Sequence, residues 1–461
     1  MAMTRVYSFP RGGISLEDPS VPARGPSVVA CLPGLSIIPL AQYSGARAYP
    51  VVSVGDTVRE GMIIARGQGR LSANIHATVP GRVIRMVSWK GDGSVNDALV
   101  IRLEGSFEKL GKKEEIFPWE GLTCFELQRV ISEYGIVEME GSGYPVSDMI
   151  SSLRNSPEPY TLVAGCVFDD PWLAADRLLC RERIGAVVEG ALIMSRAGRI
   201  NRVVYALSRG ERDLGEALVS ASAGWDIPVS LMLAGSRYPQ RNRRELELVL
   251  RRYAKKESIE LGSLLVLGPA TLAAVHDAVK LKKPILDRYV AVGGSAVKMP
   301  QVMKVRVGTR IGEVFAECGG FVNKPKRIAT GSPLQGRPVA DLDEPVTRTS
   351  YAVFAMLENR MARGRTRNCI SCGECRAVCP VGLDPEELYK QTLRGLPRLP
   401  ASSPASAYTG VARAVPTSKT RDRSPLSGGC HGCGCCDVVC PSRLPLSACI
   451  LGDTGFAGGK T

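Results

Sequence analysis

The chain has 461 residues, a formal net charge of +14 and 15 cysteines. This length exceeds what one hydrophobic core supports, so we expect several domains. No run approaches the roughly 20 apolar residues that cross a bilayer, and no signal peptide is visible, so we expect a soluble or peripheral protein of a reducing compartment. Only 6% of the residues are aromatic and no basic-aromatic RNA motif is present, which argues against nucleic-acid binding. The excess of Lys and Arg favours an anionic membrane surface or an acidic electron carrier, or a simply solvated surface.

The N-terminal part divides into an arm over residues 1–25 and a glycine-punctuated region over 26–104. Period-2 alternation at 51–61 and 75–84 predicts short strands separated by turns. This pattern resembles the barrel-sandwich fold of lipoyl and biotinyl carriers. No lysine stands at the hairpin tip between the two units, so we expect a structural barrel with nothing to acylate.

Residues 118–282 alternate apolar strand patterns with helical ones, which is typical of a parallel or mixed sheet with crossover helices. We expect strands at Thr161–Cys166, Arg202–Ser208, Pro228–Leu231 and Gly262–Leu267, and helices at Pro171–Cys180, Arg183–Ser195 and Arg241–Ala254. Residues 285–345 favour strands again, at Ile285–Val292 and Met303–Val307, followed by a helix at Gly312–Glu317. A small β-grasp domain fits this segment.

The C-terminal part, 351–450, carries the spacing Cys-x-x-Cys-x-x-Cys-x-x-x-Cys-Pro twice, beginning at Cys369 and at Cys430. In two-cluster bacterial ferredoxins the fourth cysteine of each such run ligates the other [4Fe–4S] cluster. The spacing therefore predicts two ligand sets: Cys369, Cys372, Cys375 and Cys440 for cluster 1, and Cys430, Cys433, Cys436 and Cys379 for cluster 2. Zinc is the alternative, but zinc sites usually repeat pairs of ligands. Cys435 and His431 are not expected to be ligands.

The segments around the two runs give further expectations. Helices are predicted at Asp384–Arg394, with an aspartate cap and a proline at its first position, and at Leu444–Ile450. Residues 396–429, rich in Pro, Ser, Ala and Arg, indicate a flexible insertion, either solvated or docked to a partner or lipid headgroups, and 451–461 a tail. Five cysteines outside the runs are expected to be small buried apolar residues: Cys31, Cys124, Cys166, Cys180 and Cys318.

The order of these modules resembles the C subunit of the Rnf complex, a membrane-bound complex that links NADH to ferredoxin-type carriers. Besides both cysteine runs, the resemblance rests on Gly12-Gly13-Ile14, His76-Ala77, Pro80-Gly81, Gly331–Gly336 and Val346–Thr349. The flavin subunit of respiratory complex I and a cobalamin reductase are similar more weakly. The resemblance implies a multidomain α/β protein: an N-terminal barrel-sandwich β domain, a central α/β domain like the complex I flavin subunit, an SLBB-like β-grasp domain and a C-terminal α-helical two-cluster ferredoxin domain.

The resemblance also implies that NADH reduces FMN in the central domain and that single electrons then pass through two clusters. By the family pattern, FMN or NADH would contact Gly135, Gly141, Gly143, Asp169, Asp170 and Thr271. The sequence departs from this pattern, because two glycines of the phosphate-binding loop are Glu138 and Glu140, a lysine is Met149 and an asparagine is Gly268. Side chains and negative charge in this loop would oppose a phosphate, so FMN and NADH binding stays open.

Our main hypothesis is an oxidoreductase subunit that transfers electrons within an Rnf-type ion-translocating complex. It would lie on the cytoplasmic face of a bacterial inner membrane and contact integral membrane subunits and an acidic ferredoxin or flavodoxin. Two alternatives remain, namely a relay that has lost its flavin site and a soluble flavin and iron–sulfur reductase similar to cobalamin reductases.

Overall fold

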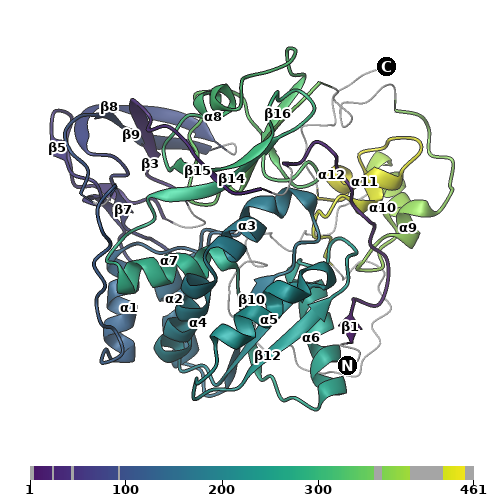
Figure 1. Ribbon diagram of the computed structural model, residues 1–461. Coiled ribbons are helices and arrows are strands. Elements are labelled where there is room, and N and C mark those ends of the chain that lie inside the picture. Colours follow the sequence, from purple (N-terminus) through teal and green to yellow (C-terminus); the bar gives the residue numbers. More distant parts are fainter. Residues whose placement is uncertain are drawn as a thin grey trace.

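The computed structural model describes residues 5–22, 25–42, 46–91, 94–108, 110–357, 366–394 and 429–451. Within these ranges the chain forms four β-sheets and a helical C-terminal lobe (Figure 1). The multidomain α/β class expected from the sequence is confirmed. Nearly all of the expected insertion, 396–429, and of the tail, 451–461, lies outside the described residues.

Two small sheets form the barrel-sandwich. One contains β3 (Leu35–Pro39), β9 (Ser94–Leu103), β8 (Gly81–Gly91) and β5 (Thr57–Val58), and the other contains β4 (Tyr49–Pro50), β6 (Ile63–Arg66) and β7 (Ile75–His76). Apolar side chains from both sheets, such as Ile38, Ile64 and Leu99, are fully buried between them. A Cβ atom at Gly81 would overlap the Arg102 carbonyl oxygen on β9, so only glycine allows these two strands to pair here.

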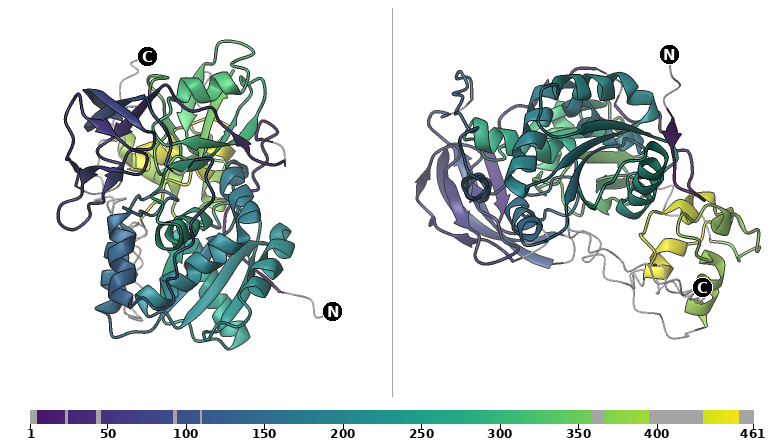
Figure 2. Two further views of the ribbon diagram at one scale, coloured as in Figure 1. Left: turned by 60° about the vertical axis from the view of Figure 1, so that its left-hand side comes forward. Right: turned by 90° about the horizontal axis from the view of Figure 1, so that it is seen from below.

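The central sheet has five parallel strands. Their order is β1 (Val6–Tyr7), β12 (Val229–Ala234), β11 (Arg202–Ser208), β10 (Tyr160–Cys166) and β13 (Ser263–Leu267). Helix α6 (Arg243–Glu257) packs on the face that contains Val163 and Val204. The opposite face is covered by α1 (Cys124–Glu133), α2 (Val146–Arg154), α3 (Ala174–Glu182), α4 (Ile184–Gly198), α5 (Arg212–Ala221) and α7 (Pro269–Lys280) (Figure 2). Because helices cover both faces, β10 is buried along its whole length, which explains its continuous apolar sequence.

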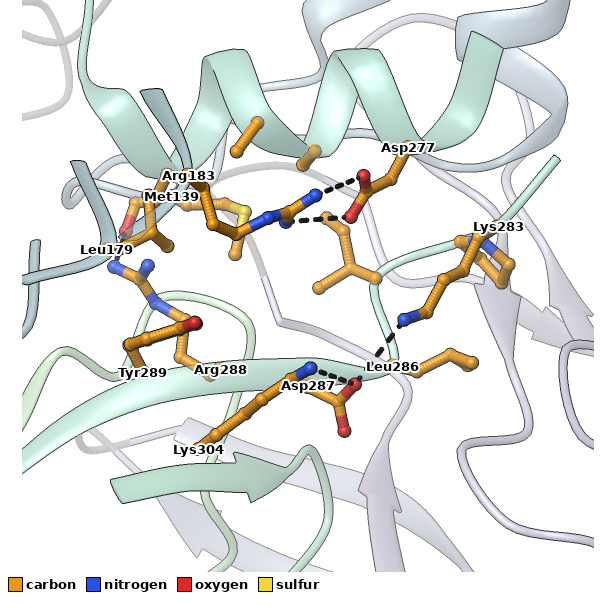
Figure 3. A pocket seen from close by; sticks show the side chains of 15 residues that line it. Met139, Leu179, Arg183, Asp277, Lys283, Leu286, Asp287, Arg288, Tyr289 and Lys304 are labelled. Carbon is orange, nitrogen blue, oxygen red and sulfur yellow. Dashed lines mark hydrogen bonds and ion pairs between the residues drawn. The ribbon is translucent and has the colours of Figure 1, made fainter. Parts of the chain in front are cut away.

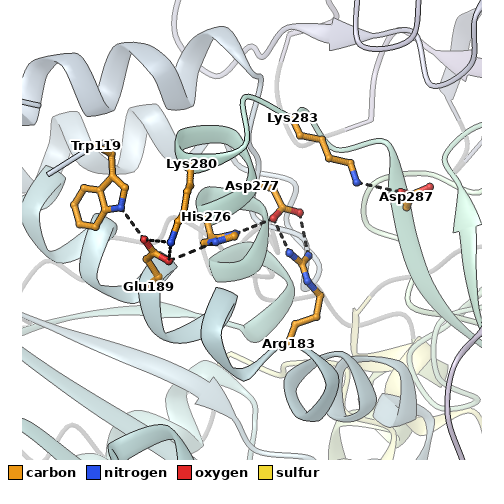
Figure 4. Close-up of polar contacts among 8 residues, drawn as sticks. All are labelled: Trp119, Arg183, Glu189, His276, Asp277, Lys280, Lys283 and Asp287. Atoms are coloured by element: carbon orange, nitrogen blue, oxygen red, sulfur yellow. Dashed lines mark hydrogen bonds and ion pairs between the residues drawn. The ribbon is translucent and has the colours of Figure 1, made fainter. Parts of the chain in front are cut away.

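Polar contacts join α4 and α7 within this layer (Figure 4). Glu189 on α4 accepts hydrogen bonds from Lys280 Nζ at 2.6 Å and from Trp119 Nε1 at 2.8 Å. Asp277 on α7 pairs with Arg183 at 2.6 Å. These partly buried pairs fix the position of α7, whose N-terminus borders the cavity described below.

A six-stranded sheet follows the central domain. Its order is β17 (Arg337–Pro338), β16 (Arg327–Thr330), β18 (Ala352–Met356), β14 (Asp287–Gly293), β15 (Gln301–Arg306) and β2 (Val28–Val29), and α8 (Ile311–Glu317) packs against it. Strand β18 lies inside the range 351–450 that we expected for the ferredoxin domain. Strand β2 comes from the region that we expected to belong to the barrel. Both pairings are long-range, which is why the local pattern did not reveal them.

The C-terminal lobe contains α9 (Glu374–Ala377), α10 (Pro385–Leu393), α11 (Cys435–Val439) and α12 (Leu446–Leu451). Helix α10 begins after Asp384, whose side chain accepts a hydrogen bond from the Glu387 amide, as the sequence predicted. Helices α9 and α11 pack together, as do α10 and α12, so the lobe has approximate two-fold symmetry. Among the described helices, none combines the length and apolar character that crossing a membrane requires.

The N-terminal arm fastens this lobe to the central domain. The Gly13 amide donates to the Val378 carbonyl at 2.8 Å, and the Ile14 amide donates to the Tyr238 carbonyl at 2.9 Å. Arg237 donates to the carbonyls of Gly12 and Phe9, both at 2.7 Å. The arm therefore lies between the central sheet and the lobe and contacts both, as its course in Figure 1 shows.

Candidate iron–sulfur centre and the adjoining cavity

The two cysteine runs meet at two cavities in the lobe. One cavity is lined by Cys369, Cys372, Cys375 and Cys440, and the other by Cys379, Cys430, Cys433, Cys435 and Cys436. The structure thus brings together both predicted ligand sets, including the exchange of the fourth cysteine between the runs. No group of three or more His, Cys, Asp or Glu in the described part of the chain is placed to hold a metal ion; the cysteines instead surround shared spaces.

The backbone around these cysteines suits a polynuclear cluster. Gly373 and Gly434, at φ angles of 79° and 74°, precede α9 and α11 and turn the chain sharply within each cysteine run. Three backbone amides point at cysteine sulfurs: Leu383 at Cys379 (3.2 Å), Gly432 at Cys430 (3.4 Å) and Leu444 at Cys440 (3.4 Å). Such N–H···S hydrogen bonds stabilise thiolates that ligate a cluster and tune its potential. The residues present therefore fit a [4Fe–4S] cluster at each set.

The two sets differ in exposure. In the first set, Cys372 is exposed and the neighbouring Ile370 has 67% of its surface exposed. In the second set, Cys433 and Cys436 are buried, and the Cys433 carbonyl accepts a hydrogen bond from the Tyr238 hydroxyl at 2.9 Å. The second set therefore faces the central domain, and the first set faces outward.

A cavity of about 540 Å³ separates the second set from the central sheet. It lies at the carboxyl ends of parallel strands, where α/β sheets usually bind ligands. Its lining includes Cys430 and His431 of the lobe, Arg243 and Arg244 at the start of α6, and Gly268 before α7. His431 thus belongs to a loop at the boundary of the two domains, within 3.5 Å of Glu245.

The predicted flavin residues divide into three groups. Asp169 and Asp170 line the cavity. Gly141 and Gly143 flank Ser142, which lines it, while Thr271 lies in the first turn of α7 and bonds to the Glu140 side chain. The structure does not place Gly135 at the cavity; a Cβ atom at this position would overlap the Asn74 carbonyl oxygen of the barrel.

Sequence reasoning missed two buried cations, Arg241, which lines this cavity, and Arg288, which pairs with the same aspartate as Arg241. The Arg241 amide donates to Asp169 at 3.0 Å, and the Arg241 guanidinium lies 3.6 Å from Asp176. Arg288, which is almost fully buried, pairs with Asp176 at 3.1 Å. Burial raises the pKa of Asp169 to about 6, although the Arg241 amide and charge oppose this. Asp176 and Arg288 lie in segments whose sequence predicts only an ordinary helix and strand, so no local motif identifies them as part of a site.

The five cysteines outside the runs follow the prediction only in part. Cys166, Cys180 and Cys318 are buried as expected, whereas Cys124 is partly exposed and Cys31 is exposed. The prediction was wrong for Cys31 because its segment follows the edge strand β2 along the surface, where the Glu317 carboxylate accepts its amide at 2.9 Å.

Another cavity, of about 50 Å³, lies between α7 and β14 (Figure 3). The charged residues drawn there are already paired: Arg183 with Asp277 at 2.6 Å, and Asp287 with Lys283 at 3.7 Å and Lys304 at 3.9 Å. We interpret this cavity as a junction between the central domain and the six-stranded sheet, remote from the cysteine sets.

Comparisons with known proteins agree with this architecture. Residues 9–105 match the family described as RnfC Barrel sandwich hybrid domain, residues 131–277 match Nuo51 FMN-binding domain, and residues 339–384 match 4Fe-4S dicluster domain. The C subunit of the ion-translocating oxidoreductase complex of Rhodobacter capsulatus is 32% identical over 77% of this chain and 69% of its own. The C subunit of the proton-translocating ferredoxin:NAD(+) oxidoreductase complex of Clostridium ljungdahlii is 29% identical over 82% of this chain and 83% of its own. The chain therefore belongs to the family of C subunits of ion-translocating oxidoreductase complexes, and it is an iron–sulfur electron-transfer subunit of an Rnf-type complex.

Proposed function

We propose that this subunit holds cluster 1 on Cys369, Cys372, Cys375 and Cys440, and cluster 2 on Cys430, Cys433, Cys436 and Cys379. One observation carries this proposal: each cavity is lined by the first three cysteines of the spacing in one run and by the fourth cysteine of the other run, and the second cavity is lined by Cys435 as well. When bound, a [4Fe–4S] cluster accepts and releases one electron at a time. The cysteines hold the two sites side by side in one lobe, and the amides that point at sulfur favour the thiolate form.

The different burial of the two sets supports a different position for each cluster on the path of the electrons. Cluster 2 would face the cavity of the central domain, and cluster 1 would lie at the surface beside the exposed Cys372. Two exposed cations lie next to ligands of cluster 1 in the sequence: Arg367 precedes Cys369, and Arg443 follows Cys440. Positive charge beside an exposed redox centre favours the docking of an acidic protein. We therefore assign the cluster 1 surface to an acidic carrier of the ferredoxin or flavodoxin type.

The names of the relatives support the rest of the assignment. A relative from Acetobacterium woodii, 25% identical over 79% of this chain and 82% of its own, is named as the C subunit of a Na(+)-translocating ferredoxin:NAD(+) oxidoreductase complex. We propose that this chain likewise binds integral membrane subunits at the cytoplasmic face of the inner membrane. Its electron transfer would then be coupled to ion movement through those subunits.

Anaerobic reconstitution of the full chain tests the cluster assignment. We expect about eight irons and eight sulfides per chain, from two four-iron clusters, and a visible band that dithionite bleaches. Serine variants of one cysteine from each set, Cys375→Ser and Cys436→Ser, should each disturb one cluster and leave the other. Binding of one or two zinc ions per chain without sulfide would overturn the proposal.

A further inference from the structure

The carboxylates of Glu138 and Glu140 accept hydrogen bonds from backbone amides, Glu138 within its own loop and Glu140 at the start of α7. Glu138 accepts the Glu140 amide at 3.0 Å and the Ser142 amide at 2.6 Å. Glu140 accepts the amide of Thr271, in the first turn of α7, at 3.0 Å and also bonds to the Thr271 hydroxyl. A glycine-rich loop and a helix N-terminus bind phosphate through amides of this kind. In this chain, three such amides are already occupied by internal carboxylates.

Glu140 and Gly268 fit each other as a pair. A Cβ atom at position 268 would overlap the Cγ and Oε1 atoms of Glu140. The resemblance described in the sequence analysis implies a glycine where Glu140 stands and an asparagine where Gly268 stands, so the two side chains depart from that pattern in opposite directions. The Glu140 carboxylate occupies the space in front of α7 that a side chain at position 268 would need. The two positions therefore fit each other, which indicates a linked change rather than two independent losses of binding residues.

The backbone of Met139, between the two glutamates, also holds this loop in place. The Met139 amide donates to the Thr271 hydroxyl at 2.9 Å, and the Met139 carbonyl accepts from Arg288 at 3.1 Å. Figure 3 shows the Arg288 guanidinium directed toward Met139. Because Thr271 also bonds to Glu140, the loop, α7 and β14 are tied together with both carboxylates in place. Expelling the carboxylates to admit a phosphate would therefore break several buried hydrogen bonds at once.

We propose that Glu138 and Glu140 replace the phosphate of a flavin nucleotide, so that the central domain closes its own phosphate site and does not hold FMN. NADH then has no flavin to reduce in this domain, and the clusters receive electrons from a partner protein. This inference deepens the proposed electron relay, but it concerns the central domain alone and can fail while the cluster assignment stands.

Flavin binding to the reconstituted full chain tests the inference, because FMN and riboflavin differ only in the phosphate. The wild-type chain should bind FMN no more tightly than riboflavin, and NADH should leave the cluster absorbance unchanged while dithionite bleaches it. The variant E138G/E140G/M149K/G268N should bind FMN at least about tenfold more tightly than the wild-type chain, since charge-assisted hydrogen bonds to phosphate become available. The control E115G, in an exposed loop, should behave as wild type.

Stoichiometric FMN in the wild-type chain, bound more tightly than riboflavin, would overturn the inference. The inference would also fail if the four-position variant folds and its affinity for FMN does not rise above that of the wild-type chain. A second measurement does not depend on flavin. Gly268→Asn alone should lower the melting temperature, whereas it should be tolerated in the E140G background. Equal losses in both backgrounds would overturn the pairing. Iron content, measured on every variant, shows separately whether the clusters are present.

Discussion

One thiol of the second cysteine run, Cys435, falls outside the ligand spacing. Cys435 is fully buried, its sulfur lies 4.0 Å from the Tyr238 carbonyl oxygen, and it packs with Tyr238 and Ile14. We predict that Cys435→Ser keeps both clusters, because its role is packing, whereas Cys433→Ser loses or alters cluster 2. Iron content and the electron paramagnetic resonance spectrum of the reduced chain check this. Loss of half the iron in Cys435→Ser would refute the assignment of the ligand set.

Glu140 predicts a pH dependence at the same scale. Burial, and next the charge of Glu138, raise its pKa from the ordinary 4.5 to about 7. The folded protein therefore keeps a proton that the unfolded chain has released, so this group's contribution to stability falls as pH rises from about 4.5 to about 7. In Glu140→Gln the free energy of unfolding should fall less over that range, by at most about 3 kcal/mol, as thermal unfolding at a series of pH values measures.

Asp169 remains in the variant, and burial raises its pKa to about 6, so Glu140→Gln should reduce the slope without removing it. The matched control is Glu115→Gln, which removes a carboxylate at an exposed position. Parallel stability curves for Glu140→Gln and the wild-type chain would show that Glu140 does not titrate in this range.

At the scale of elements, the sequence predicted the structure well where the pattern is local. The strand expected at Arg202–Ser208 has those bounds in the structure, and the helix expected at Gly312–Glu317 starts one residue earlier. The strands β1, β2 and β18 were missed because each is short and pairs with a partner far away in the sequence. In the site, the cysteine sets followed from spacing. The fit of Glu140 to Gly268 did not, because it depends on two elements that meet only in the fold.

The N-terminal arm is the element whose contacts give a direct prediction. Gly12 has a φ angle of 65°, and a Cβ atom there would lie 2.6 Å from the Val378 carbonyl oxygen and 2.7 Å from the Cys379 carbonyl carbon. We predict that Gly12→Ala lowers the free energy of unfolding by about 1–3 kcal/mol, through strain and overpacking. It should also shift the potential of cluster 2, because Cys379 is a predicted ligand.

Gly34→Ala is the matched control, since nothing lies near a Cβ atom at that position. Thermal unfolding and a redox titration of the reconstituted chain compare the two variants. If Gly12→Ala matches Gly34→Ala in both measurements, the arm does not position the lobe.

At the scale of the whole molecule, the net charge of +14 attracts any anionic partner. The two arginines beside cluster 1 support local docking only if they speed reduction by an acidic carrier more than two arginines elsewhere do. We predict that R367E/R443E slows reduction by an acidic ferredoxin at low salt by about tenfold, whereas R212E/R251E, with the same change in net charge on α5 and α6, slows it much less. Stopped-flow bleaching of the clusters measures both rates.

Salt distinguishes local docking from the overall field. The Debye length falls from about 10 Å at 0.1 M to about 3 Å at 1 M, so the difference between the two double variants should shrink as salt is added. Arg212 and Arg251 form surface pairs with Glu216 and Glu247, so their loss tests general charge without touching the lobe. Equal slowing of both variants at low salt would mean that net charge alone attracts the carrier. The exposed face of cluster 1 would then not be its docking site.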